Sequence, residues 1–220
     1  MRKLLTYGIG IAILVTGGIF FYGYQAAAYV PERYTALLEG DPAQQAKAST
    51  EMFNRSQRLI NRTKKPGKWS EVFTAEQING YLAVDLQKQF GHIISGDVKD
   101  PRVHIGDKTI TLFCKYEGPP TSSVLSIELE PFLDDRRELA LRIVDARAGS
   151  LGLPIGRVQA LLSEAALNAD LSVRGVEEDG QPVAIIALPT TKNGRPIELT
   201  HLELAGDELR LAGEIKPRGK

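Results

Sequence analysis

The chain opens with its longest apolar segment. Residues 4–30 contain no charged side chain, and Arg2 and Lys3 stand directly before them. A helix crosses the hydrocarbon of a bilayer with about 20 apolar residues, because it rises about 1.5 Å per residue. The pattern therefore predicts a retained transmembrane helix over residues 1–30.

The cations around this segment indicate its orientation. Lys and Arg resist transfer across a bilayer, so the more cationic end of a membrane helix stays in the cytoplasm. Arg2 and Lys3 precede the segment, whereas Arg33 is the only cation in the 15 residues after Val30. We expect a single-pass protein with a cytoplasmic N-terminus and an extracytoplasmic C-terminal domain. Cleavage of the segment as a secretory signal, at the alanines of residues 26–28, stays open as an alternative.

A linker at residues 31–40 is expected to join this anchor to the domain. Asp41 and Pro42 then provide an N-cap and a first-turn proline for a helix that runs to about residue 61. Apolar residues at helical spacing form a narrow stripe on this helix. The stripe consists of Met52, Phe53, Leu59 and Ile60.

Two further segments show the features of helices. Thr74 and Gln77 form a capping box, in which each side chain bonds the backbone of the other residue, so a helix is expected from there to about residue 89. Residues 155–169 carry apolar side chains at helical spacing after a glycine-rich break at residues 149–154.

Elsewhere the apolar residues alternate with polar ones, which is typical of half-buried strands. The predicted strands cover residues 103–105, 110–116, 125–129, 139–143, 171–177, 182–188, 199–204 and 209–215. Short polar turns separate most of them, as in antiparallel hairpins. We therefore expect an α+β fold: a transmembrane helix followed by a helix-covered, mainly antiparallel curved β-sheet domain at residues 41–220.

Part of this pattern resembles a known family. The N-terminal apolar segment, the run Phe73-Thr74-Ala75-Glu76-Gln77-Ile78-Asn79-Gly80-Tyr81-Leu82, the meander and the run Gly149-Ser150-Leu151-Gly152-Leu153-Pro154 are similar to those of the YpmS-like membrane-anchored extracytoplasmic proteins. The similarity covers about residues 70–165. The resemblance implies an envelope protein of unknown role, and it implies no catalytic residue.

Charge and cysteine content exclude several classes of protein. The 190 residues after the anchor contain 25 Lys plus Arg and 27 Asp plus Glu, whereas general nucleic-acid binders carry a basic face. We therefore expect no nucleic-acid partner. Cys114 is the only cysteine, so neither an intrachain disulfide nor a multi-cysteine zinc site is present. It shares strand parity with apolar neighbours and is interpreted as a buried, inert thiol.

No catalytic, cofactor-binding or metal-binding residue is predicted. The three histidines, His92, His104 and His201, are too far apart in sequence for a local metal pair, and no nucleophile elbow or phosphate-binding glycine loop occurs. The strand and turn carboxylates are interpreted as solubilising. An enzyme stays a minor alternative that requires distant groups to converge, such as His92 with Asp97 or Asp100.

One cluster of cations is a candidate binding surface. It lies in the distal half of the first helix and the loop after it, and no acidic residue interrupts it between Glu51 and Glu71. The cations are Arg55, Arg58, Arg62, Lys64, Lys65 and Lys68. Contact with anionic lipid headgroups is one interpretation, because each cation near a charged lipid surface contributes up to about 1 kcal/mol. A solvated helix face is the other.

These observations favour a non-enzymatic binding module over an enzyme. The leading hypothesis is a membrane-anchored extracytoplasmic domain that binds lipid or another amphiphile and has the bilayer as its neighbour. The alternative hypothesis is an adaptor or assembly subunit of a membrane protein complex, with a membrane protein as its partner. The sequence does not separate the two.

Overall fold

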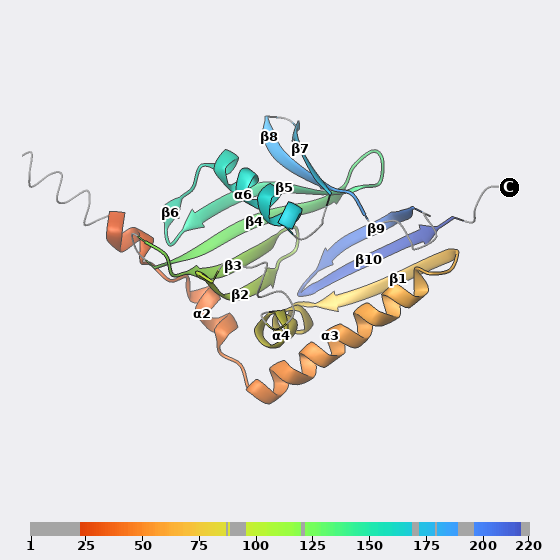
Figure 1. Cartoon of the computed structure of the whole chain (residues 1–220), viewed down its shortest axis with the longest axis horizontal. Coiled ribbons are helices and arrows are strands. Elements are labelled where there is room, and N and C mark those ends of the chain that lie inside the picture. Colours follow the sequence, from red (N-terminus) through yellow and green to blue (C-terminus); the bar gives the residue numbers. More distant parts are fainter. Residues whose placement is uncertain are drawn as a thin grey trace, which may run out of the picture.

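Two antiparallel sheets and the helices around them make up the domain (Figure 1). The computed structural model describes residues 23–86, 88, 96–119, 122–168, 172–178, 180–188 and 196–216. The helices in this part are α2 (Glu32–Leu38), α3 (Pro42–Arg62), α4 (Ala75–Val84) and α6 (Ile155–Asn168). The strands are β1 (Gly67–Thr74), β2 (Val98–Ile105), β3 (Ile110–Tyr116), β4 (Ser123–Leu133), β5 (Leu139–Ala148), β6 (Leu151–Gly152), β7 (Val173–Glu178), β8 (Gln181–Ile186), β9 (Ile197–Ala205) and β10 (Glu208–Ile215).

The larger sheet confirms the predicted antiparallel meander. Its strand order is β2-β3-β4-β5-β8-β7, with β6 paired to the end of β5. Each described strand pairing is antiparallel. One face of this sheet carries Leu129, Ile143 and Ala146, and Val158 of α6 packs against them. Burial of this apolar face explains the alternation in the sequence.

The smaller sheet has the order β1-β10-β9 and was only partly predicted. The sequence predicts β9 and β10, but it gives no sign of β1. Trp69 and Phe73 of β1 are buried, and Glu71 lies buried between them. This buried carboxylate interrupts the apolar alternation, so the strand is hidden in the sequence. Leu133 and Leu139 of the larger sheet pack against the core of the smaller one.

Helix α3 runs along β1 of the smaller sheet, and α4 packs against α3 and against β2 of the larger sheet (Figure 1). The predicted start of α3 is confirmed, since a carboxylate oxygen of Asp41 accepts a hydrogen bond of 3.0 Å from the Ala43 N–H. The capping box of Thr74 and Gln77 at the start of α4 is confirmed as well. The prediction that α4 runs to residue 89 is too long, because the helix ends at Val84.

Two of the four residues in the predicted apolar stripe of α3 face solvent instead of the core. Phe53 and Ile60 are 47% and 50% exposed. The buried positions of α3 are Ala48 and Ser49. They face α4, where Gly80 allows the helices to approach closely. Small residues at this contact therefore replace the large apolar side chains that the sequence pattern favoured.

The predicted transmembrane helix is corrected by the structure. Within the residues that the structure describes, no helix has both the length and the apolar character needed to cross a bilayer. The N-terminal transmembrane helix and the single-pass, extracytoplasmic location derived from it are therefore not supported. Residues 1–22 of the predicted anchor lie outside the described residues.

The described end of that segment belongs to the folded domain. Ala26 is 7% exposed, and its carbonyl accepts hydrogen bonds from the Ser150 N–H at 2.8 Å and the Ser150 hydroxyl at 3.2 Å. The Ala27 carbonyl accepts one from the Ser123 hydroxyl at 2.7 Å. Carbonyls at the end of a helix lack partners within that helix. Here Ser123 of β4 and Ser150 in the turn after β5 supply the donors, so Ala26 and Ala27 pack against the larger sheet.

The predicted linker at residues 31–40 contains α2, which packs on the larger sheet. The buried Tyr34 ring lies 5.8 Å from that of Phe113, and its hydroxyl donates a hydrogen bond of 2.9 Å to the Asp100 carbonyl. Asp100 has a positive φ of 47° within a register shift of β2. Arg102 follows and donates to the Leu37 carbonyl at 3.2 Å. The irregular part of β2 thus holds α2.

Candidate functional site

Two surfaces are candidates for binding, and the first is the basic end of α3. We use this name for Arg55, Arg58, Arg62, Lys64, Lys65 and Lys68. The structure brings them together at the end of α3 and the start of β1. The α3 helix places Arg55, Arg58 and Arg62 over about two turns, and the three lysines follow after the helix ends.

Two of the six cations neutralise a buried carboxylate. Glu71 of β1 is 7% exposed, and one carboxylate oxygen lies 3.4 Å from Arg55 and the other 3.4 Å from Arg62. Arg62 also donates to the Ser70 carbonyl at 3.2 Å. A buried carboxylate is costly unless it is paired and hydrogen-bonded. Arg55 and Arg62 therefore have a structural role that the sequence did not indicate.

The other cations face solvent. Arg58, Lys64 and Lys65 are exposed, and none of them has an ion pair within the residues that the structure describes. Lys68 is exposed too, and the strand register places it opposite Glu214 of β10. The net positive charge of this surface is therefore concentrated where α3 ends.

Two apolar side chains accompany these cations. Phe53 and Ile60 are about half exposed. They are seven residues apart, which is close to two helical turns, so they lie on one side of α3. Arg58 lies on the opposite side of α3, about 160° around the helix from Ile60, and Lys64 follows in the loop after the helix ends. The distal half of α3 therefore exposes both cations and apolar side chains.

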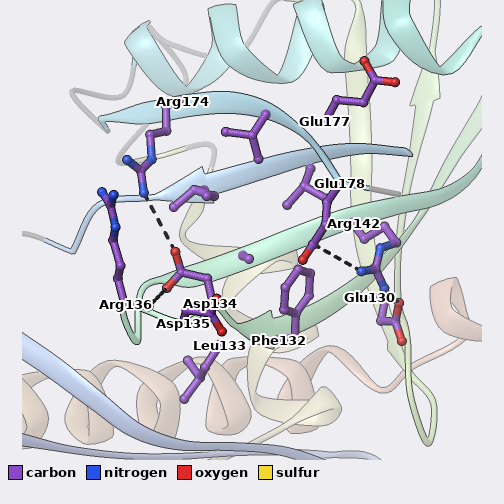
Figure 2. A pocket seen from close by; sticks show the side chains of 14 residues that line it. Glu130, Phe132, Leu133, Asp134, Asp135, Arg136, Arg142, Arg174, Glu177 and Glu178 are labelled. Carbon is purple, nitrogen blue, oxygen red and sulfur yellow. Dashed lines mark hydrogen bonds and ion pairs between the residues drawn. The ribbon is translucent and has the colours of Figure 1, made fainter. Parts of the chain in front are cut away.

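The second candidate surface is an open groove on the outer face of the larger sheet. Figure 2 shows its residues, which come from β4, β5, β7, β8 and the turn between β4 and β5. Ala140 and Arg142 alternate in β5 with residues that face α6, so the groove lies on the opposite face. We call it the outer groove, and its volume is about 680 Å³.

Ion pairs cross the outer groove from one strand to another. The Arg142 guanidinium of β5 lies 2.6 Å from a carboxylate oxygen of Glu130 in β4 and 3.3 Å from one of Glu178 in β7. The same guanidinium carbon lies 4.8 Å from the centre of the Phe132 ring, a cation–π distance. The hydrogen bond to Glu130 contributes most to raising the pKa of Arg142, and the charges of Glu130 and Glu178 raise it further, so the guanidinium stays charged.

A second group of ion pairs lies where the turn meets β7. The Arg174 guanidinium of β7 lies 3.8 Å from a carboxylate oxygen of Asp134 (Figure 2). Arg174 also pairs with Glu138. The other oxygen of Asp134 accepts bonds from the Arg136 and Glu138 N–H groups at 2.9 and 2.7 Å. Asp134 therefore shapes the turn and also fixes Arg174.

The floor of the outer groove is apolar and its rim is charged. Phe132, Ala140, Val183 and Ile185 form one cluster beneath the ion pairs. The rim carries five carboxylates and three guanidinium groups, which leaves an excess of two negative charges. They are Glu130, Asp134, Asp135, Glu177 and Glu178 against Arg136, Arg142 and Arg174.

The remaining candidate residues do not assemble into a reactive site. His201 is exposed beside Glu203, with 3.5 Å between its Nε2 and a carboxylate oxygen. His104 is half-buried, which lowers its pKa together with the charge of Arg33. His92 lies outside the described residues. No group of three metal-ligating side chains occurs in the part of the chain that the structure describes.

Cys114 is half-buried in β3. Burial raises the pKa of its thiol to about 11. Because the thiolate is the reactive form, this thiol is a poor nucleophile at neutral pH.

The outer groove is the surface that the sequence did not predict. Glu130, Asp134 and Asp135 are interpreted from sequence as solubilising, because neighbouring carboxylates on one wet strand face or one exposed turn usually have that role. Arg142, which pairs with Glu130, is 12 residues away along the chain, and Arg174, which pairs with Asp134, is farther. The alternation of Glu130, Phe132, Ala140 and Arg142 marks the outer face, but it does not indicate that β7 closes one side.

Comparison with known proteins adds no relative. No family model matches the chain, and no curated protein matches it. The similarity to the YpmS-like family over residues 70–165 stays a prediction.

Proposed function

We propose that this chain is a non-enzymatic binding module that contacts anionic lipid headgroups through the basic end of α3. The observation that carries the proposal is the group of exposed cations Arg58, Lys64 and Lys65, which form no ion pair among the described residues, on the same half of α3 and its loop as the half-exposed Phe53 and Ile60. A solvated helix face explains the cations, but it does not explain two large apolar side chains that face water on the same half of the helix.

The free energy of such a contact is the sum of several weak contributions. Each cation near an anionic lipid surface contributes up to about 1 kcal/mol, and this attraction falls off within a Debye length. Burial of half-exposed apolar side chains adds roughly 25 cal/mol for each Å² removed from water. Binding should therefore require anionic lipid and weaken as salt is added.

The test compares charge variants of the full chain on vesicles of phosphatidylcholine with and without phosphatidylserine. Lys64→Glu together with Lys65→Glu should weaken binding to the anionic vesicles by about tenfold or more, since about 1 kcal/mol is lost per cation and 1.4 kcal/mol is a factor of ten. Co-sedimentation over a range of lipid concentrations measures the affinity.

The matched control is Lys47→Glu together with Lys108→Glu. Both lysines are exposed, and the double variant changes the net charge equally. Lys47 is 17 residues before Lys64, about 25 Å away along a helix. All variants share residues 1–22, so these residues contribute equally to each measurement. Equal binding by both double variants, or equal binding to neutral and anionic vesicles, contradicts the proposal.

A further inference from the structure

Strand β7 is an unpaired edge of the larger sheet. It bonds to β8 on one side, and no other strand pairs with it among the described residues. Residues 174–178 are exposed, and β7 and β8 project as a hairpin at the margin of the molecule (Figure 1). An edge strand presents N–H and C=O groups that can pair with another chain.

The pairing of β7 with β8 shows which backbone groups remain open. The Ala187 N–H donates to the Ser172 carbonyl at 2.9 Å, so these residues form a hydrogen-bonded pair. Such pairs alternate with non-hydrogen-bonded pairs along antiparallel strands. The even-numbered residues of β7 therefore bond to β8, and Val173, Gly175 and Glu177 direct their N–H and C=O groups to the open edge.

The side chains of β7 complement a second copy of the same strand. In one antiparallel register, Val176 lies opposite Val176 of the second copy on a two-fold axis. Arg174 then lies opposite Glu178, and Glu178 opposite Arg174. These are non-hydrogen-bonded pairs, in which side chains approach most closely. Gly175 and Glu177 form the hydrogen-bonded pairs between them.

We propose that two copies of this chain associate through their β7 edges in this register, so that the two larger sheets become one continuous sheet. The partner is a second copy because β7 is complementary in charge to itself. The proposal is independent of lipid binding by α3.

Neighbouring registers lack this complementarity. Only the odd-numbered residues of β7 have open backbone groups, so the neighbouring registers are those in which one strand slides along the other by two residues. One such shift places Glu177 opposite Glu177, and like charges directly opposite each other destabilise a pair. The other places Arg174 opposite Val176 and leaves both charges without a partner. The register centred on Val176 is therefore the favoured one.

Side chains of the first copy border the place of a second strand on both faces of β7. On the groove face, Arg174 already pairs with Glu138, and Glu178 with Arg142. Association would join these ion pairs into one network across both copies. On the other face, the Gln159 amide of α6 lies where a Cβ of Gly175 would project, at 2.7 Å, so this side chain is next to the position that Glu177 of the second copy would take.

Disulfide trapping in the full chain tests the register. Cβ atoms directly opposite in a non-hydrogen-bonded pair lie about 4.5–5.5 Å apart, close to the distance that a disulfide spans. Val176→Cys should therefore give a covalent dimer on mild oxidation. Glu177→Cys is the control. Glu177 lies opposite Gly175 of the second copy, so the two cysteines would be separated by one strand spacing and two residues of rise, about 8 Å, which is too far for a disulfide. Cys114 is present in both variants.

Charge reversal tests the partner. With Val176→Cys as reporter, Glu178→Arg or Arg174→Glu alone should weaken association roughly tenfold, because like charges then face each other at both pairs. An equal mixture of the two variants restores opposite charges, so the mixed dimer should form. This rescue excludes misfolding as the cause. The proposal is overturned if Val176→Cys dimerises no more than Glu177→Cys, or if the mixture dimerises no more than either variant alone.

Discussion

A single glycine decides how closely α3 and α4 approach. A Cβ atom at Gly80 would lie 2.7 Å from Cβ of Ala48, and 2.8 Å from both the Gln45 carbonyl oxygen and the Ser49 nitrogen. Two of these are backbone atoms of α3, which cannot move without shifting the helix. The sequence shows only a glycine inside a helix, which costs roughly 1 kcal/mol relative to alanine.

Gly80→Ala therefore separates helix propensity from packing. Propensity alone predicts a gain in stability, whereas the short distances predict a loss of about 1–3 kcal/mol, the usual cost of overpacking. Urea unfolding measures the difference. The control is Gly156→Ala in α6, where a Cβ meets nothing within 4 Å, so a gain of up to about 1 kcal/mol is expected. A more stable Gly80→Ala variant would show that α3 and α4 are not in close contact.

At the scale of elements, a side-chain amide replaces a missing strand. Among the residues that the structure describes, β2 pairs with no strand except β3, so its other edge needs partners. Asn79 of α4 supplies them: its amide group donates to the Val103 carbonyl at 2.8 Å, and its oxygen accepts from the Val103 N–H at 2.7 Å. The sequence places Asn79 on a helix but cannot indicate a strand 24 residues later.

Asn79→Ala should leave both backbone groups of Val103 without partners. Val103 is buried, and a buried unsatisfied polar group costs about 1–3 kcal/mol. The Val103 amide should therefore exchange with solvent faster than in the native chain, as hydrogen exchange measures. Asn54→Ala, at an exposed position of α3, is the control and should leave this exchange unchanged. Unchanged exchange in both variants refutes the role of Asn79.

Most of the other helices and strands were predictable from the sequence, but the transmembrane helix is not supported among the described residues, and the segment predicted as a linker contains α2. Capping signals at Asp41 and Thr74 and the alternation of β2 to β5 depend on neighbours in sequence, so they were predicted correctly. Strand β1, the pairing of Glu71 with Arg55 and Arg62, and the outer groove depend on contacts between distant segments. Local patterns do not contain that information.

At the scale of the whole molecule, two buried acidic groups limit stability at high pH. Burial raises the pKa of the Cys114 thiol from 9.0 to about 11. Burial, and then the charge of Asp100, raises the pKa of Tyr34 from 10.0 to about 12. Both groups ionise earlier in the unfolded chain, so unfolding releases protons in alkaline solution and becomes easier as pH rises.

These two groups should therefore make the free energy of unfolding fall from about pH 9 as pH rises toward 12, the range of the two pKa shifts. Urea titrations at successive pH values measure it. Cys114→Ala removes the thiol, so its decline should begin about one pH unit later, where tyrosine ionises in the unfolded chain. Identical pH dependence of both proteins contradicts a buried thiol.

The contact between Ala26 and Ser150 has a consequence for biosynthesis. The two residues are 124 positions apart. Ribosomes add roughly 5–20 residues each second, so the nascent N-terminal segment waits about 6–25 seconds before its docking site is translated. Throughout that interval the carbonyl of Ala26 lacks its donors on Ser150, and the segment is available to any factor that meets the emerging polypeptide.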